Sequence, residues 1–224
     1  ERAWVLSIDG AIPAGMKGQP TFSRAFGRVH VLRYSLGASR VRYDFVEHWS
    51  QAEASWTRDR QVRSCRRRSG GIARGGGLGR GVLTPISDRF DCDPADPQQF
   101  IGPVVMEDLD NIPRYCLWQH PRGDEPVTLR FRDVPLGAEL VFYGGIYYEH
   151  ERMRQGGTVD VTISIDGSAR AKFVHRDGDG WKQLRIATAA ISSRFASEVA
   201  IEVRAPDPAL RSFCWAATTR EAAR

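Results

Sequence analysis

The stretch TVDVTISI at residues 158–165 alternates polar and apolar side chains with great regularity. Side chains point alternately to the two faces of a β-strand, so this pattern predicts a strand with one buried face. Asp166-Gly167 follows at once, and Asp-Gly is a favoured pair for a tight hairpin turn. The stretch therefore predicts a half-buried strand that leads into an antiparallel hairpin. The residues expected to face inward are Val159, Val161, Ile163 and Ile165.

Similar short segments, separated by turn residues, lie on both sides of this hairpin. A series of short strands with little helix between them is typical of a β-sandwich. We therefore expect residues 84–220 to form an all-β domain, an antiparallel β-sandwich. The other candidate strands are residues 115–118, 127–132, 138–143, 171–175, 181–186, 198–203 and 212–217.

The N-terminal residues 1–57 also favour strands. Residues 3–8, 28–36 and 41–46 are β-prone, which predicts an additional, mostly-β N-terminal segment. Between residues 45 and 56 the aromatic and alanine residues recur at helical spacing, so a short helix is an alternative there. The segment either forms a separate domain or adds strands to the sandwich.

Residues 58–83 differ from their surroundings, because they are rich in arginine and glycine and poor in aliphatic side chains. Glycine loses the most conformational entropy on ordering, so we expect a long loop or linker that Cys65 could anchor. Its arginines could dock an anionic partner or a subunit of a larger assembly, although a solvated loop also explains them. Specific nucleic-acid binding is not expected, because no aromatic residues are interleaved with them. The candidate partner-binding residues are Arg66, Arg67, Arg68, Arg74 and Arg80.

The charge of the chain comes almost entirely from arginine. The formal net charge is +5, and 29 of the 32 basic residues are arginine. Arginine pairs readily with carboxylates, and 27 acidic residues are present to neutralise most of this charge. The basic composition is therefore not taken as a sign of nucleic-acid binding. No apolar run approaches the roughly 18 residues that a membrane-spanning helix needs.

Four cysteines occur at wide spacing, without the closely spaced pairs that bind zinc. An even number of separated cysteines predicts two disulfides in an oxidising compartment, although four buried thiols are the alternative. We expect Cys116 to pair with Cys214; Cys65 and Cys92 are the other two disulfide candidates, and the full connectivity stays open. The chain begins at Glu1 without an initiator methionine, so we expect a processed, exported protein that is periplasmic, on the cell surface or extracellular.

Several turn and core motifs of the C-terminal half resemble those of galactose-binding-like jelly-roll domains in exported proteins of high-GC bacteria. The resemblance covers about half of the chain. It implies a carbohydrate-binding module or a non-catalytic appendage of a cell-envelope protein. The segments that carry it are CLWQHP (116–121), VPLG (134–137), GGTVDVTI (156–163), DGW (179–181) and FCW (213–215).

An aromatic cluster supplies the candidate ligand-binding residues. Sugar rings present apolar C–H faces that stack on aromatic side chains, while neighbouring polar groups bind the hydroxyls. Gly144-Gly145 interrupts the strand before several of these aromatics, which favours a loop position over the core. Packing of the same side chains in the core is the alternative. The candidates are Tyr143, Tyr147, Tyr148, His150 and Trp181.

Two closely spaced carboxylates, Asp177 and Asp179, are candidate ligands for a structural calcium ion, the only cofactor considered. Asp-Gly pairs also serve hairpin turns, which is the competing explanation. The histidines are not accompanied by a G-x-S-x-G nucleophile elbow, so serine-hydrolase chemistry is not expected. A glycoside-acting enzyme needs only a suitable carboxylate pair and remains an alternative. We therefore expect a non-catalytic exported protein that binds carbohydrate or another envelope component, or else a structural subunit of a larger assembly.

Overall fold

A computed structural model describes residues 2–12, 19–35, 40–69, 88–93, 96, 99–191 and 196–222. The chain divides into two compact units, Glu1–Arg40 and Val41–Arg224. Within the described residues, no helix combines the length and the apolar character that crossing a bilayer requires. Arg74 and Arg80 lie outside the described residues.

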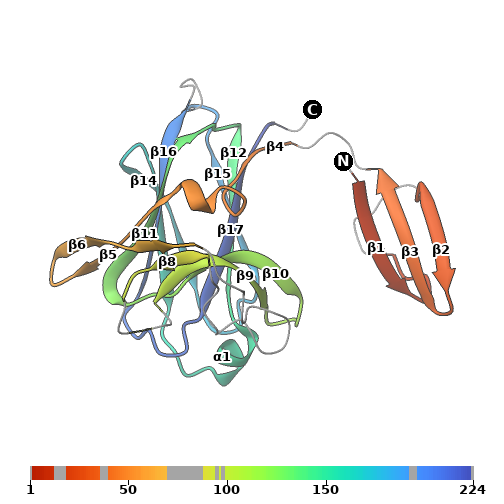
Figure 1. Cartoon of the computed structure of the whole chain (residues 1–224), viewed down its shortest axis with the longest axis horizontal. Coiled ribbons are helices and arrows are strands. Elements are labelled where there is room, and N and C mark those ends of the chain that lie inside the picture. Colours follow the sequence, from red (N-terminus) through yellow and green to blue (C-terminus); the bar gives the residue numbers. More distant parts are fainter. Residues whose placement is uncertain are drawn as a thin grey trace. The chain divides into compact units, whose positions relative to one another are not determined.

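The first unit is a small antiparallel sheet, called sheet I, in the strand order β1-β3-β2 (Figure 1). Strands β1 and β3 agree with the β-prone segments 3–8 and 28–36, whereas β2 was not among the predicted strands. A small cluster of Val5, Leu32 and Tyr34 is buried on one of its faces. The strands are β1 (Arg2–Ile8), β2 (Phe22–Phe26) and β3 (Val29–Ser35).

The second unit is a β-sandwich, which confirms the predicted all-β class. Sheet II has the order β15-β12-β17-β10-β9-β8-β7, with β4 also paired to β17. All of its pairings are antiparallel. Its strands are β4 (Val41–Asp44), β7 (Arg66–Arg68), β8 (Arg89–Asp91), β9 (Phe100–Glu107), β10 (Pro113–Gln119), β12 (Glu139–Ile146), β15 (Lys182–Ala187) and β17 (Phe213–Arg220).

Sheet III completes the sandwich in the order β14-β13-β16-β11-β5-β6. Its central strand β13 is the alternating stretch on which the prediction rests, and its four aliphatic side chains are all buried, as expected. The turn at Asp166-Gly167 connects β13 to β14, again as expected. The strands are β5 (Glu53–Arg58), β6 (Gln61–Ser64), β11 (Gly123–Val134), β13 (Val159–Ile165), β14 (Ser168–His175) and β16 (Ser197–Ala205).

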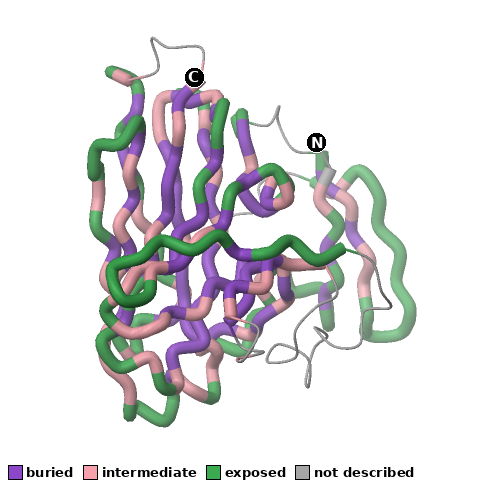
Figure 2. The backbone as a smooth tube through the Cα atoms, turned by 60° about the vertical axis from the view of Figure 1, so that its left-hand side comes forward, coloured by how far each residue is buried: buried purple, intermediate pink, exposed green. Residues whose placement is uncertain are grey.

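The main core lies between sheets II and III, where inward-facing aliphatic and aromatic side chains form one continuous cluster. Figure 2 shows that buried residues are concentrated along the strands of the sandwich. Gln119 is fully buried in this core and its polar atoms are paired. Its Nε2 donates to the carbonyls of Val127 (2.8 Å) and Ile201 (3.2 Å), and its Oε1 accepts from Nε1 of Trp215 (2.7 Å). This one side chain therefore links strands of both sheets.

The opposite face of sheet II carries a second buried cluster around the Cys116–Cys214 disulfide. The bond joins the neighbouring strands β10 and β17 and confirms the expected pair. Phe100 and Trp118 stack beside it at a centroid distance of 5.5 Å. The disulfide is thus shielded by apolar side chains on a face that a simple sandwich would leave to solvent.

Part of the arginine- and glycine-rich segment is strand rather than loop, which corrects our expectation for residues 58–83. Strand β6 pairs with β5 at the edge of sheet III, and β7 pairs with β8 at the edge of sheet II. Cys65, between β6 and β7, is buried and forms a disulfide with Cys92. The chain therefore passes from one sheet to the other at this bond, where backbone pairing and the disulfide order a segment with few apolar side chains.

Two further elements differ from the sequence patterns. The helical spacing after residue 45 corresponds only to the short 3-10 helix Trp49–Gln51, after which the chain enters strand β5. Strand β9 was not among the predicted strands. The helix α1 (Tyr148–Met153) follows β12 and lies at one end of the sandwich (Figure 1).

Candidate functional site

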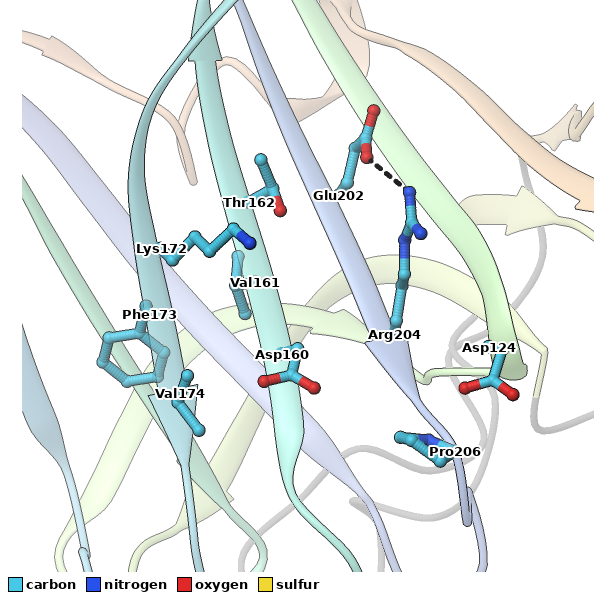
Figure 3. Close-up of a pocket in the computed structure, with 10 residues that line it drawn as sticks. All are labelled: Asp124, Asp160, Val161, Thr162, Lys172, Phe173, Val174, Glu202, Arg204 and Pro206. Atoms are coloured by element: carbon cyan, nitrogen blue, oxygen red, sulfur yellow. Dashed lines mark hydrogen bonds and ion pairs between the residues drawn. The ribbon is translucent and has the colours of Figure 1, made fainter.

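A depression of about 550 Å³ lies on the outer face of sheet III and is called the sheet III groove (Figure 3). Its volume falls in the range of small-ligand sites, roughly 300 to 1,000 Å³. Strands β13, β14 and β16 form its floor, and polar side chains alternate along them with residues that point into the core. The lining residues are Asp124, Asp160, Val161, Thr162, Lys172, Phe173, Val174, Glu202, Arg204 and Pro206.

The register of the strands arranges the polar side chains in rows across the sheet. Thr162 lies between Lys172 on β14 and Glu202 on β16, and Asp160 lies opposite Arg204. Directly opposed side chains in antiparallel strands are close neighbours, with Cβ atoms about 5 Å apart. Each row therefore places hydrogen-bond donors beside acceptors.

The Arg204 guanidinium donates to the carboxylate of Glu202 on the same strand, with a distance of 3.2 Å from Nη2 to Oε2 (Figure 3). Both groups are at least partly exposed, so the pair is reachable from solvent. A guanidinium in this position can donate to a carboxylate and to a ligand oxygen simultaneously, because it carries five N–H groups.

One end of the groove is shaped by an irregularity in β11. The pairing of β11 with β16 shifts between Gly123 and Val127, and the exposed carboxylate of Asp124 lies at this shift. A bulge leaves residues outside the regular ladder and redirects their side chains, and bulges are frequent beside functional sites. Asp124 and Pro206 thereby bound the groove at this end.

The groove is suited to a ligand with many hydroxyl groups. A hydroxyl both donates and accepts hydrogen bonds, and the floor offers ammonium, guanidinium and hydroxyl donors next to carboxylate acceptors. Of the described residues that line it, the aromatic Phe173 is buried in the core. Recognition in this groove would therefore depend on hydrogen bonds rather than on stacking against a ring.

The predicted aromatic residues gather elsewhere, around helix α1. The ring of Tyr147 lies edge-on to the rings of Tyr148 (4.8 Å) and His150 (5.6 Å). Burial raises the pKa of the Tyr147 phenol and lowers the pKa of the His150 imidazole, since both charged forms lose hydration. Tyr147 thus contacts two other side chains that the sequence analysis singled out, while their role in ligand binding stays a prediction.

Trp181 belongs to the same end of the sandwich, because Trp181 and Tyr147 both pack against the cluster around the Cys116–Cys214 disulfide. A Cβ on Gly145 would come within 2.9 Å of the Trp181 indole, so the glycine permits this close approach. Tyr143 is on β12, and its hydroxyl accepts a hydrogen bond from Gln183 (2.7 Å). The arrangement combines partly exposed aromatic rings with core packing, so both explanations of the aromatic cluster apply to it.

A buried polar network holds α1 to the turn between β14 and β15. Glu151 is 1% exposed, and its Oε1 accepts from the backbone N–H groups of Gly178 (3.0 Å) and Gly180 (2.8 Å). Burial raises the pKa of Glu151, although the two hydrogen bonds act in the opposite direction. His175 is fully buried beside it, with Nε2 2.8 Å from the carbonyl of Gly180. These contacts fix the position of the helix that carries the aromatic residues.

The two candidate calcium ligands form ion pairs with basic side chains. Asp177 accepts from Nη1 of the fully buried Arg211 (2.6 Å), and Asp179 accepts from Nζ of Lys182 (2.9 Å). Among the described residues, no three His, Cys, Asp or Glu side chains are grouped as a metal site would need. Both carboxylates thus have partners in the local fold, and the calcium site stays a prediction.

The arginines of β7 also have partners within the sandwich. Arg67 donates to the carbonyl of Ser50 (2.9 Å) and lies over the ring of Trp49, and Arg68 pairs with Asp91 (2.9 Å). Charged side chains on an edge strand discourage pairing with another sheet. Arg66 lies in the same exposed strand. These contacts account for Arg67 and Arg68 within the sandwich.

No protein-family model and no curated protein matches the sequence. Several solved structures that are similar to parts of the chain contain carbohydrate-binding modules. A CBM51 module with INT domains of ZmpB from Clostridium perfringens, in complex with GlcNAc, is 16% identical, with a TM-score of 0.40 over 54% of this chain and 25% of that one. Another structure of these domains is 13% identical, with a TM-score of 0.39 over 81% of this chain and 40% of that one. A GH26-CBM35 β-(1,4)-mannanase of Podospora anserina is 11% identical, with a TM-score of 0.27 over 50% and 22%. The chain thus spans less than half the length of these proteins.

The sequence did not identify the sheet III groove as a site. The strands were recognised from their inward-facing apolar residues, and the polar residues of the groove occupy the outward-facing positions. Such positions are polar in any solvated sheet. The rows arise only when β13 pairs with β14 and β16, which brings together residues about 40 positions apart. The only signal for the groove in the sequence was the set of polar residues that alternate with the aliphatic ones in residues 158–165.

Proposed function

We propose that the protein is a non-catalytic carbohydrate-binding β-sandwich and that the glycan lies in the sheet III groove. The observation that carries the proposal is the groove itself, in which cross-strand register places Lys172, Thr162 and Glu202 in one row and Asp160 opposite Arg204. The alternation of donors and acceptors matches the hydroxyl pattern of a sugar chain. The open face of a sheet suits an extended oligosaccharide.

The two disulfides support a place for this protein outside the cytoplasm. All four cysteines are buried, and both pairs join separate elements of the sandwich. Disulfides persist mainly in oxidising compartments. Export to the periplasm, the cell surface or the medium is therefore part of the proposal.

Binding to an array of immobilised glycans tests the proposal. The wild-type chain is compared with the variant Asp160→Asn/Arg204→Gln, which changes the groove without adding bulk. The matched control is Glu139→Gln/Arg185→Gln, which likewise neutralises one carboxylate and one guanidinium, here an ion pair on sheet II. We expect the groove variant to lose the signal and the control to keep it. Absence of binding by the wild-type chain to every glycan would refute the proposal.

The aromatic residues around α1 are a second candidate for the glycan-binding site. A Tyr147→Ala/Tyr148→Ala variant on the same array distinguishes the two positions. If this variant loses the signal and the groove variant keeps it, the glycan binds at α1, with His150, Trp181 and Tyr143 as the neighbouring groups to test. The groove assignment would then be wrong, while carbohydrate binding would stand.

Two other functions follow from specific features. The groove contains three carboxylates, Asp124, Asp160 and Glu202, so a glycoside-acting enzyme is the catalytic alternative. Release of new reducing ends from an array-positive glycan would favour that function. A role as an interaction subunit would rest on the arginines after Cys65, and an Arg66→Gln/Arg67→Gln/Arg68→Gln variant with altered size in solution would favour it.

A further inference from the structure

Sheet I of the first unit has one face that is almost entirely apolar. Because side chains alternate along each strand, nine residues from β1, β3 and β2 share this face and form three cross-strand rows. Seven of the nine are apolar and the other two are arginines. The rows are Trp4–Arg33–Phe22, Leu6–Val31–Arg24 and Ile8–Val29–Phe26.

These apolar side chains are exposed to a degree that is unusual for their type. Leu6 is 77% exposed, Ile8 65% and Trp4 61%. The opposite face of sheet I already contains the buried cluster of Val5, Leu32 and Tyr34. A small antiparallel sheet normally has one polar, solvated face, so an apolar pattern on both faces indicates a second partner.

The rings on this face are not arranged for stacking against planar ligands. Trp4 and Phe22 meet edge to face, with an interplanar angle of 66°. The guanidinium of Arg33 lies 5.7 Å from the Trp4 ring centroid, and that of Arg24 lies 4.9 Å from the Phe26 centroid. Nucleobases or flat sugar surfaces need accessible ring faces. The geometry therefore favours a partner that makes apolar contacts without stacking.

The charge of the unit complements an anionic surface. Residues 1–40 contain six basic and two acidic residues. Arg24 and Arg33 lie within the apolar face itself, with their guanidinium groups over the rings of Phe26 and Trp4. A second copy of the chain placed face to face would bring these like charges together, which is unfavourable.

We propose that this face of sheet I binds the surface of a bilayer that contains anionic phospholipid. Exposed Trp, Phe, Leu and Ile side chains enter the boundary between headgroups and acyl chains, and the two arginines bind lipid phosphates. This contact places the first unit on a membrane surface and is independent of the sheet III groove.

Flotation of the full chain with lipid vesicles tests the proposal. Vesicles of phosphatidylcholine alone are compared with vesicles that also contain phosphatidylglycerol, and the second kind should bind the wild-type chain more tightly. An Arg24→Gln/Arg33→Gln variant should bind the anionic vesicles about 30-fold more weakly, because each basic residue at such a surface is worth about fivefold in affinity. A Leu6→Ser/Ile8→Ser variant should lose more than about tenfold on both kinds of vesicle.

The control variant Val62→Ser/Ile112→Ser removes two exposed apolar side chains from the second unit and should bind as the wild type does. Circular dichroism of each variant checks that the sheets still form. Failure of the wild-type chain to float with anionic vesicles would overturn the proposal. So would equal flotation of all variants, or a dimer or a single-stranded nucleic-acid complex that Leu6→Ser/Ile8→Ser abolishes.

Discussion

Removal of the Cys116–Cys214 disulfide is expected to destabilise the sandwich by about 4 to 5 kcal/mol, because a long loop is released in the unfolded chain. The two cysteines are 98 residues apart, whereas Cys65 and Cys92 are 27 residues apart. The loop-entropy relation gives about 4.7 kcal/mol for the longer loop and about 3.5 kcal/mol for the shorter one. The predicted difference between the two bonds is thus about 1 kcal/mol.

The comparison uses two variants, Cys116→Ala/Cys214→Ala and Cys65→Ala/Cys92→Ala, each of which retains the other disulfide. All four positions are buried, so the loss of two sulfur atoms costs each variant a similar amount and largely cancels in the difference. Unfolding in guanidinium chloride reports the free energy of unfolding. Intact mass before and after reduction verifies the bonds that are present.

The result that refutes this reasoning is a greater loss in the Cys65–Cys92 variant than in the Cys116–Cys214 variant. In that case local strain or packing at the edge of the sheets, rather than loop length, determines the contribution of each bond. Complete thiol labelling of the unreduced wild-type chain would refute the disulfides themselves.

Three further predictions concern the interior and its pH dependence. Gln119→Leu should lower the free energy of unfolding by about 2 to 4 kcal/mol in a denaturant titration, because it leaves the buried Nε1–H of Trp215 unpaired. Gly156→Ala should lower the free energy of unfolding by about 1 to 3 kcal/mol, seen as a lower Tm, because the new Cβ would lie 2.1 Å from Cζ of Arg211. Burial lowers the pKa of His120 from 6.5 to about 4. As the pH falls, the unfolded chain therefore binds a proton at His120 at a higher pH than the folded chain does. The contribution of His120 to stability is present above pH 6.5 and is lost as the pH falls toward 4. Denaturant titrations across this range should therefore show that the free energy of unfolding declines less steeply in His120→Gln than in the wild type.

Sequence reasoning recovered strand β13 because one of its faces is solvated. In β13 the aliphatic residues alternate with polar ones, and this period of two identifies both the strand and its buried side. Strand β9 was missed because FIGPVVME has no such alternation: Phe100, Val104 and Met106 are buried on the outer face of sheet II, and Ile101 is buried in the core. A strand buried on both faces cannot be recognised by its period alone.

The segment around Cys65 was predicted wrongly for the opposite reason, because its strands bury no side chains. Every residue of β6 and β7 is exposed, so these strands carry no burial pattern at all. They form because their backbones pair with β5 and β8 and because Cys65 is bonded to Cys92, and the sequence does not display either cause locally. Composition therefore suggested a loop where tertiary pairing makes two edge strands.

The candidate site was predictable only where its residues are close in sequence. Tyr147, Tyr148 and His150 lie close together at the start of α1, where the Tyr147 ring contacts the rings of Tyr148 and His150. The sheet III groove is different, because Asp160 and Arg204 become neighbours only through the pairing of β13 with β16. Strand order across a sheet is a non-local property, which a single sequence does not reveal.

An NMR titration of the isotope-labelled chain with a glycan that the array identifies tests the central claim most directly. If the glycan lies in the sheet III groove, the largest amide shifts will fall on the strands that carry Asp160, Lys172 and Arg204. The Asp160→Asn/Arg204→Gln variant will then show no saturable shifts. Shifts confined to Tyr147, Tyr148 and Trp181, or no shifts with any glycan, would contradict the claim.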